Sequence, residues 1–266
     1  MPSDSSAVLA ATPALVVDEA ILDANIARMA DFTSRAGLVL RPHVKTHKSL
    51  EIARRQRAAG AQGITVATLS EALVFAEAGF DDIFVAYPLW IDDFRGAALE
   101  DLLERSSIMV GIDSADAVSQ LAREGFASRT NFSVMVEVDS GHHRSGVQPA
   151  DAGQLAAAAL DAGLAVAGVF TFPGHSYSPD ARSSAAKDEH DALEAAVDSL
   201  ADRDIPARVV SGGSTPSLEF ATSSVLTEVR PGVYVFGDAQ QWELGTCAPE
   251  TIALTALATV VSRSSD

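Results

Sequence analysis

The sequence predicts an α/β protein built as a closed (β/α)8 TIM-type barrel. Short apolar runs alternate with Ala- and Leu-rich amphipathic segments along most of the 266 residues. Strand and helix in strict alternation imply parallel pairing, and eight such units favour a closed barrel over an open doubly wound sheet. Because 47% of the residues are hydrophobic, the chain can fill one large core or two modest ones.

Eight segments fit the strands of this barrel, because each is a short, mostly apolar run next to a helical pattern. They are residues 38–44, 63–68, 82–87, 106–112, 132–138, 166–172, 207–213 and 226–232. The helical patterns include residues 49–60, 70–79, 113–125, 151–163 and 188–203. Many of them end in glycine, which often terminates a helix. In the last, Leu193, Val197 and Leu200 form a one-sided apolar stripe that suits packing on a sheet.

Two extended runs have no place in a closed barrel. Residues 12–18 precede the first long helix, and residues 250–263 follow the last strand. We expect them to pair with each other or to begin a second sheet. The predicted units are an N-terminal strand outside the barrel (1–18), the barrel (19–248) and the first strand of an incomplete β-domain (249–266). Because the sequence stops three residues after Arg263, we expect this C-terminal β-domain to be truncated.

Charge and cysteine content exclude several classes of protein. Acidic residues outnumber basic ones 36 to 19, so the surface does not attract polyanions and nucleic acid is not an expected partner. The single cysteine, Cys247, forms no internal disulfide, and the N-terminus lacks a signal peptide's basic and apolar regions. No apolar run is long enough to span a membrane. We therefore expect a cytoplasmic protein without a membrane contact.

The first predicted strand carries the strongest candidate for chemistry. Active sites of such barrels lie at the C-terminal ends of the strands, and the period of two places Arg41, His43 and Lys45 on one side of the chain. Lys45 is therefore expected at the mouth, pointing inward. Apolar walls and the neighbouring Arg41 should lower its pKa and free the amine for a Schiff base. The alternative is a solvated charge, which is the expectation for Lys48 in the same KTHK segment.

A second candidate follows the seventh predicted strand, in the segment SGGSTPS. Its glycines permit close backbone approach, Ser214 and Thr215 offer hydroxyls, and Pro216 suits the start of a helix. Barrels often bind phosphate at this position, although an ordinary strand-to-helix turn uses the same residue types. An inward lysine and a phosphate cradle together suit pyridoxal 5'-phosphate, which has an aldehyde at one end and a phosphate at the other.

Polar residues also follow the fifth and sixth predicted strands. Arg144 is suited to donate to the phenolic oxygen of the cofactor or to a substrate carboxylate, or else to form a surface ion pair. His175 and Tyr177 are suited to transfer protons or to hold the pyridine ring. The adjacent His142 and His143 are weak metal candidates, and the sequence has no H-x-C or C-x-x-C pair, so no metal site is predicted.

Several of these segments together resemble the D-threonine aldolase and D-serine dehydratase-like family, whose barrel is of the alanine racemase N-terminal domain type. The resemblance runs from Thr12 to the end of the chain, and RPHVKTHK is its most specific part. The other matching segments are TPALVVD, GITVATLSEA, EVDSGHHRSGV, GHSY, SGGSTP and GVYVFGDAQQ.

The resemblance implies roles for particular residues. Lys45 would form the internal aldimine, and Arg144 would lie beside the pyridoxal ring. Tyr234 resembles a family tyrosine that reaches the cofactor end of the site. His175 and Tyr177 are the catalytic candidates because of their place after the sixth strand. The expected phosphate-binding residues are Ser211, Gly212, Gly213, Ser214 and Thr215.

The implied function is a pyridoxal-phosphate-dependent lyase for D-3-hydroxy amino acids, of the D-threonine aldolase or D-serine dehydratase type. We expect this chain to form a homodimer. Family members bind Zn²⁺ or Mn²⁺ through a β-rich second domain, whose ligands we expect this chain to lack. Little lyase activity would follow, because no cation stabilises the β-oxygen. The alternatives are a non-catalytic pyridoxal-phosphate carrier, an amino-acid racemase, and a scaffold protein without cofactor.

Overall fold

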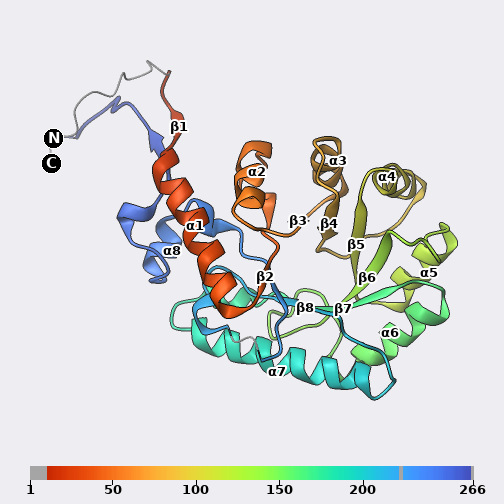
Figure 1. Ribbon diagram of the computed structural model, residues 1–266. Helices are drawn as coiled ribbons and strands as arrows, with labels where there is room; N and C mark the ends of the chain where they lie inside the picture. The colour runs from red at the N-terminus through yellow and green to blue at the C-terminus, as the bar shows by residue number, and fades with distance from the viewer. Residues whose placement is uncertain (1–10, 222–223, 265–266) are drawn as a thin grey trace.

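The computed structural model describes residues 11–221 and 224–264 and contains eight parallel strands that curl around a common axis (Figure 1). Each of the eight predicted segments contains one of these strands, which confirms the (β/α)8 fold class. The strands are β2 (Val39–Leu40), β3 (Ile64–Val66), β4 (Asp82–Val85), β5 (Ser107–Ile112), β6 (Phe132–Glu137), β7 (Val166–Phe170), β8 (Val209–Gly212) and β9 (Glu228–Val229).

The two ends of this sheet meet and close the barrel. In sheet order the strands run β2-β9-β8-β7-β6-β5-β4-β3, so β2 and β3 are the outer members. A parallel bridge joins His43, just after β2, to Thr65 of β3. The N–H of Thr65 donates to the carbonyl of Pro42 over 2.9 Å, and the N–H of Gln62 donates to the carbonyl of Leu40 over 2.8 Å. Proline has no N–H of its own, so this junction carries few ladder bonds.

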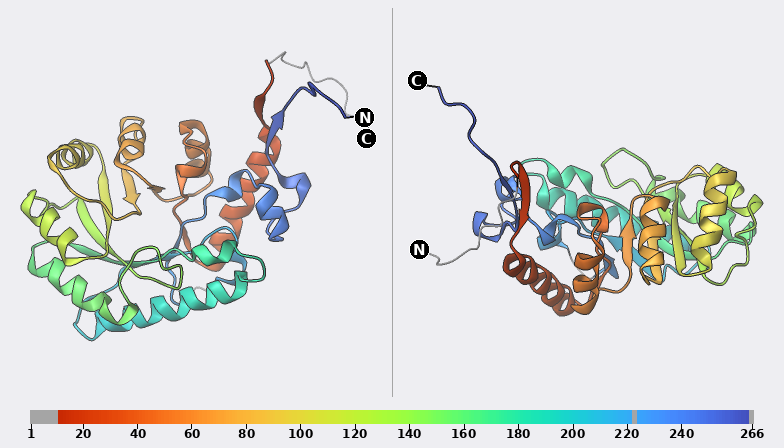
Figure 2. Two further views of the ribbon diagram at one scale, coloured as in Figure 1. Left: turned by 180° about the vertical axis from the view of Figure 1, so that it is seen from behind. Right: turned by 90° about the horizontal axis from the view of Figure 1, so that it is seen from above.

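Helices cover the outside of the strands (Figures 1 and 2). Most begin at a side chain that accepts a backbone N–H, such as Asp18, Ser49 and Thr68. The longest segments are α1 and α7, on neighbouring sides of the barrel. The bounds are α1 (Glu19–Ala36), α2 (Leu50–Ala58), α3 (Leu69–Glu77), α4 (Asp93–Leu103), α5 (Ala115–Arg123), α6 (Ala152–Asp161), α7 (Arg182–Ala201) and α8 (Ala239–Glu243).

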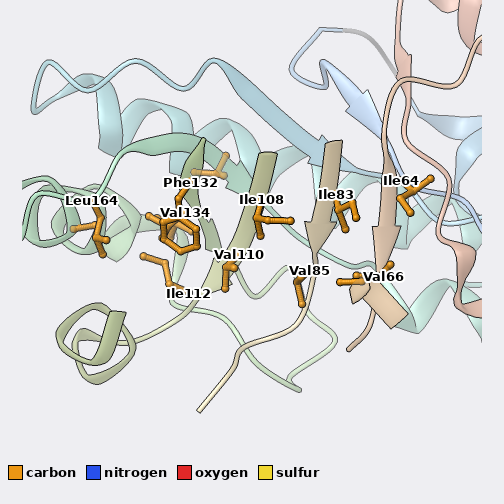
Figure 3. Close-up of a cluster of buried hydrophobic side chains, with 14 of the residues drawn as sticks. Ile64, Val66, Ile83, Val85, Ile108, Val110, Ile112, Phe132, Val134 and Leu164 are labelled. Carbon is orange, nitrogen blue, oxygen red and sulfur yellow. The ribbon is translucent and has the colours of Figure 1, made fainter. Parts of the chain in front are cut away.

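The main apolar core lies between the strands and the helices. Alternate residues of β3 to β6 point toward the helices, and their side chains are almost completely buried. Figure 3 shows Ile64, Val66, Ile83, Val85, Ile108, Val110, Ile112, Phe132, Val134 and Leu164 of this cluster. The residues between them, such as Thr65 and Phe84, face the barrel interior. The same alternation that builds the core therefore decides which side chains line the barrel.

The barrel interior contains charged side chains that neutralise one another. Arg41 donates to Glu228 over 2.6 Å and to both oxygens of Asp82 over 2.7 and 2.9 Å. Glu228 also accepts from Ser211 over 2.6 Å, and Arg230 donates to the Ser211 hydroxyl over 2.9 Å. This network links β2, β4, β8 and β9, and we refer to it as the floor of the barrel mouth.

A two-stranded ribbon lies outside the barrel, beyond α1 and α8 (Figures 1 and 2). In it β1 (Ala14–Val17) pairs antiparallel with β10 (Leu254–Leu257). Leu15 is 76% exposed and Leu257 is 47% exposed, so part of its apolar surface is uncovered. The proposed unit boundaries at residues 18 and 248 stay a prediction, and residues 1–10 and 265–266 of those units lie outside the described residues. No helix in the described ranges is long and apolar enough to cross a membrane.

Candidate active site

Lys45 follows β2 in the short 3-10 turn Val44–Thr46, at the end of the barrel where the strands finish. Its Nζ lies 5.5 Å from the centre of the Phe172 ring. The side chain opens to the mouth, yet the surrounding protein displaces enough water to lower its pKa from the ordinary lysine value, and Arg144 and Arg230 lower it further. A lowered pKa leaves more of the amine uncharged and nucleophilic.

Arg41 does not supply the cation expected beside Lys45. Glu228 and Asp82 bind its guanidinium, and they hold its pKa above the ordinary arginine value despite burial. The cations that act on Lys45, Arg144 and Arg230, come from the loops after β6 and β9 instead. The period of two correctly places Arg41 on the inner side, but the sequence does not show which acidic residues meet it there.

Phe172 lies at the centre of the mouth. The guanidinium of Arg144 lies 5.3 Å from the centre of its ring and 5.5 Å from that of Tyr87. The rings of His142 and Tyr177 lie 5.7 and 6.3 Å from the same phenylalanine, measured between ring centres. The loops after β6 and β7 thus bring an arginine and two aromatic groups to the ring that also lies beside the lysine, and the loop after β4 adds Tyr87 beside the arginine. Phe172 and Tyr87 were not among the predicted site residues, although each is the last residue of a predicted strand.

Glu137 is a buried carboxylate at the end of β6 that was not among the predicted site residues. Its Oε1 accepts from Ser145 over 2.8 Å and lies 3.8 Å from Arg144. Its Oε2 is buried and has no hydrogen-bond partner among the described residues. Burial raises the pKa of Glu137 above the ordinary value, so its charge is sensitive to what lies beside it.

The segment after β8 forms a tight turn whose N–H groups already have partners. The N–H of Gly213 donates to Glu189 of α7 over 2.7 Å, and that of Ser214 donates to the Ser217 hydroxyl over 3.0 Å. No α-helix of the described chain begins at Pro216, where the sequence predicted one; a 3-10 segment follows at Leu218–Phe220. The sequence predicted free N–H groups at the start of a helix here. In the described part of the chain this turn does not provide them.

Both glycines of this turn are required by the protein's own packing. A Cβ at position 212 would lie 2.5 Å from Glu189, and one at position 213 would lie 3.0 Å from Leu218 and 3.1 Å from Val229. Gly213 also has a φ of 73°, which side chains disfavour. Ser211, a predicted cofactor contact, points into the barrel and bonds to the charged network there. Burial raises the pKa of Glu189 to about 7.

Thr215 and Tyr234 come together on one side of the turn. Both border a cavity of about 400 Å³ between α1, α8 and the loops after β8 and β9. The Thr215 hydroxyl is buried and has no hydrogen-bond partner in the described parts of the chain. Tyr234 is 8% exposed, and its hydroxyl accepts from Nε2 of Gln56 over 2.9 Å. Lys45 lies outside the lining of this cavity.

His175 and Tyr177 share the 3-10 segment Gly174–Tyr177 but have different surroundings. Nε2 of His175 lies 3.2 Å from Asp188, and its Nδ1 is buried with no partner among the residues described. The structure thus joins His175 to α7 rather than to Lys45. Burial, with Asp238 nearby, raises the pKa of Tyr177 to about 12, so this phenol keeps its proton at neutral pH. No group of three His, Cys, Asp or Glu side chains within residues 11–221 and 224–264 is arranged to hold a metal ion.

Comparisons with known proteins extend over nearly the whole chain. The model of the family "Alanine racemase, N-terminal domain" matches residues 17–240. The chain is 40% identical over 262 residues to D-threo-3-hydroxyaspartate dehydratase of Delftia sp. (strain HT23), which covers 96% of this chain and 69% of that relative. It is 36% identical over 263 residues to D-threonine aldolase of Arthrobacter sp., covering 95% and 68%.

Solved structures show the same similarity. The structure of D-threo-3-hydroxyaspartate dehydratase from Delftia sp. HT23 matches with a TM-score of 0.88 and 39% identity, over 96% of this chain and 69% of that one. The structure of D-threonine aldolase from Filomicrobium marinum matches with a TM-score of 0.85 and 32% identity, over 96% and 71%. Proteins that are similar to this chain thus include both a dehydratase and an aldolase.

Proposed function

This chain belongs to the family of the alanine racemase N-terminal domain, and we propose that it is a pyridoxal 5'-phosphate-dependent lyase acting on D-3-hydroxy amino acids. The observation that carries the proposal is Lys45, an amine with a lowered pKa at the barrel mouth beside Phe172 and two arginines. The relatives named as a dehydratase and an aldolase support the lyase class and the D-hydroxy amino acid substrate.

The residues present fit this cofactor in three respects. Lys45 is a nucleophilic amine for the aldehyde. Thr215 has a buried hydroxyl without a protein partner, and Tyr234 borders the same cavity, so two donors are available to a phosphate. Arg144, near Lys45 and partly open to solvent, is free to donate to an anionic oxygen. When bound, pyridoxal 5'-phosphate supplies an electron sink for the charge that develops at the substrate α-carbon.

Each side chain of the mouth then has a defined task. Lys45 would hold the cofactor at its aldehyde end, because its amine has a lowered pKa and lies at the mouth. Arg144 donates to the phenolic oxygen or to the substrate carboxylate, and Glu137 holds the arginine in place at 3.8 Å. Tyr177 keeps its proton at neutral pH because burial raises its pKa to about 12, so its hydroxyl is available as a hydrogen-bond donor. His175, oriented by Asp188, is the second candidate for proton transfer in the same segment.

The turn after β8 would hold the phosphate through the Thr215 hydroxyl more than through its N–H groups. Glu189 and Ser217 already engage the N–H groups of Gly213 and Ser214, so the glycines chiefly give the turn its shape. Thr215 supplies the unpartnered hydroxyl. Ser211 has no direct contact with the phosphate in this proposal. It accepts a hydrogen bond from Arg230 and so holds this arginine in the floor of the mouth.

An absorbance titration tests cofactor binding. Adding pyridoxal 5'-phosphate to the purified chain should produce the visible band of a lysine-bound cofactor, and Lys45→Ala should abolish the band while the circular dichroism spectrum stays unchanged. Lys48→Ala is the matched control, because Lys48 is 66% exposed and paired with Glu71. An equal band in Lys45→Ala would refute the assignment.

Product analysis tests the reaction class. D-threonine, D-serine and D-threo-3-hydroxyaspartate should be assayed with and without Zn²⁺ or Mn²⁺. Carbon–carbon cleavage yields an aldehyde or aldehyde acid and an amino acid, whereas dehydration yields a 2-oxo acid and ammonia. Formation of either pair supports the lyase and identifies its type. Tight cofactor binding with racemised substrate, or with no product at all, would favour the racemase or the non-catalytic carrier instead.

A further inference from the structure

A chain of hydrogen bonds connects the turn that carries Lys45 to Tyr234. The backbone N–H of Ser49 donates to Nδ1 of His47 over 3.0 Å, and Nε2 of His47 lies 3.2 Å from Oε1 of Gln56. Nε2 of Gln56 then donates to the Tyr234 hydroxyl over 2.9 Å. Gln56 is 1% exposed, so water does not compete for its amide. This series of hydrogen bonds links the loops after β2 and β9 through Gln56 of α2.

The direction of every hydrogen bond in this series follows from the first one, in which the backbone N–H of Ser49 is the donor. A backbone N–H can only donate, so Nδ1 of His47 must accept and the imidazole proton must lie on Nε2. Nε2 therefore donates to Oε1 of Gln56, which turns the amide nitrogen toward Tyr234. Burial also lowers the pKa of His47 to about 4, which keeps the ring neutral.

The tyrosine oxygen is thereby made an acceptor, and its own proton remains available. Among the described residues Gln56 is the only hydrogen-bond partner of the Tyr234 hydroxyl. The Thr215 hydroxyl, on the border of the same cavity, likewise has no partner there. Two hydroxyl donors from different loops thus border one space, and a phosphate group, which at neutral pH accepts hydrogen bonds almost exclusively, matches that pair.

We propose that His47 and Gln56 are positioning residues that hold Tyr234 as a hydrogen-bond donor to the phosphate of pyridoxal 5'-phosphate. The inference rests on the proposed function. It assigns to the KTHK segment a second role besides the covalent lysine: Lys45 binds the aldehyde end, and His47, two residues later, orients the phenol for the phosphate end.

Gln56→Glu tests this assignment. It keeps the shape of the side chain but reverses the direction of its hydrogen bond with the Tyr234 hydroxyl. The ionised carboxylate of this variant still accepts from His47, but it must also accept from Tyr234, which turns the phenol proton away from the cavity. Affinity for pyridoxal 5'-phosphate should fall by at least about tenfold at about pH 8. Affinity for pyridoxal, which lacks the phosphate, should change by less than about twofold. Both are measured by absorbance titration.

Two controls separate orientation from charge. In the Tyr234→Phe background, Gln56→Glu should have little further effect, because no phenol proton is left to redirect. Gln62→Glu, on an exposed side chain, adds the same charge outside the hydrogen-bond chain and should leave both affinities unchanged. Circular dichroism and thermal melting show whether each variant folds.

The outcomes are distinct. A phosphate-specific loss in Gln56→Glu that disappears in the Tyr234→Phe background supports the positioning role. An equal loss in both backgrounds, or no loss between about pH 6 and pH 9, overturns it, because the effect is then repulsion by the new charge or nothing. Failure of the unmodified chain to bind pyridoxal 5'-phosphate would instead overturn the proposed function, and this inference with it.

Discussion

At the scale of single residues, the candidate site depends on neighbours that are remote in the chain. The place of Lys45 just beyond the first barrel strand could be predicted, because an apolar run followed by polar residues is a local pattern. The period of two does not reach it, since β2 ends at Leu40 and Lys45 lies in the 3-10 turn Val44–Thr46. Phe172 and Arg230 act on Lys45 directly and Glu137 acts on its neighbour Arg144, and these three residues come from three other strands or the loops that follow them. Their proximity is set by the closure of the barrel, so no local pattern identifies them.

His47 makes the stability of the fold depend on pH. Its pKa is about 4 in the folded protein and near 6.5 when unfolded, so between these values the unfolded chain binds a proton that the folded chain does not. The free energy of unfolding should therefore decrease as pH falls from about 6.5 to about 4, by up to about 3 kcal/mol from this residue. Urea denaturation at several pH values measures the slope.

The matched variant is His47→Gln, which cannot take up a proton. Its loss of stability over the same pH interval should be smaller than that of the unmodified chain. Equal slopes for the two proteins would show that His47 does not titrate differently in the folded and unfolded states.

At the scale of elements, the turn after β8 is shaped by what packs against it. Gly213→Ala places a methyl group at positive φ and within about 3 Å of Leu218 and Val229, as the ideal Cβ positions show. We expect the free energy of unfolding to fall by about 2–4 kcal/mol, together with cofactor affinity. Thermal and urea denaturation measure the first, and absorbance titration the second.

Gly79→Ala is the control, because Gly79 has a φ of 85° but no atom within 4 Å of an added Cβ. It should lose only the cost of the backbone conformation, about 1–2 kcal/mol. If Gly213→Ala is no more destabilising than Gly79→Ala, the packing account of the turn is wrong.

At the scale of the whole molecule, the ribbon of β1 and β10 predicts a homodimer. Its outer edges have no strand partner among the described residues, and Leu15 and Leu257 are exposed on it. Multi-angle light scattering should give twice the mass of the chain, and Leu15→Glu with Leu257→Glu should shift it toward the monomer. Phe94→Glu, at a side chain that is 82% exposed on α4, should leave the mass unchanged. A monomeric unmodified chain, or a dimer insensitive to the ribbon variants, would contradict the prediction.

The sequence predicts the order of the barrel strands but not the contacts that form when the barrel closes. The alternation of strands and helices is written along the chain, so all eight barrel strands were predictable. The interior network of Arg41, Glu228 and Arg230 was not, because β2 and β9 are neighbours only after the barrel closes. For the same reason the contact of the Gly213 N–H with Glu189 of α7 was not predicted, and phosphate binding at this turn stays a prediction.

The central claim is that Lys45 is the residue that binds pyridoxal 5'-phosphate covalently. Borohydride reduction of the cofactor-treated protein, followed by proteolysis and mass spectrometry, locates the modified lysine. The chain has only three lysines, so the three possible labelled peptides are easily distinguished. We predict one pyridoxyl group on Lys45 and none on Lys48 or Lys187. Label on either of those two, or no label at all, would contradict the account.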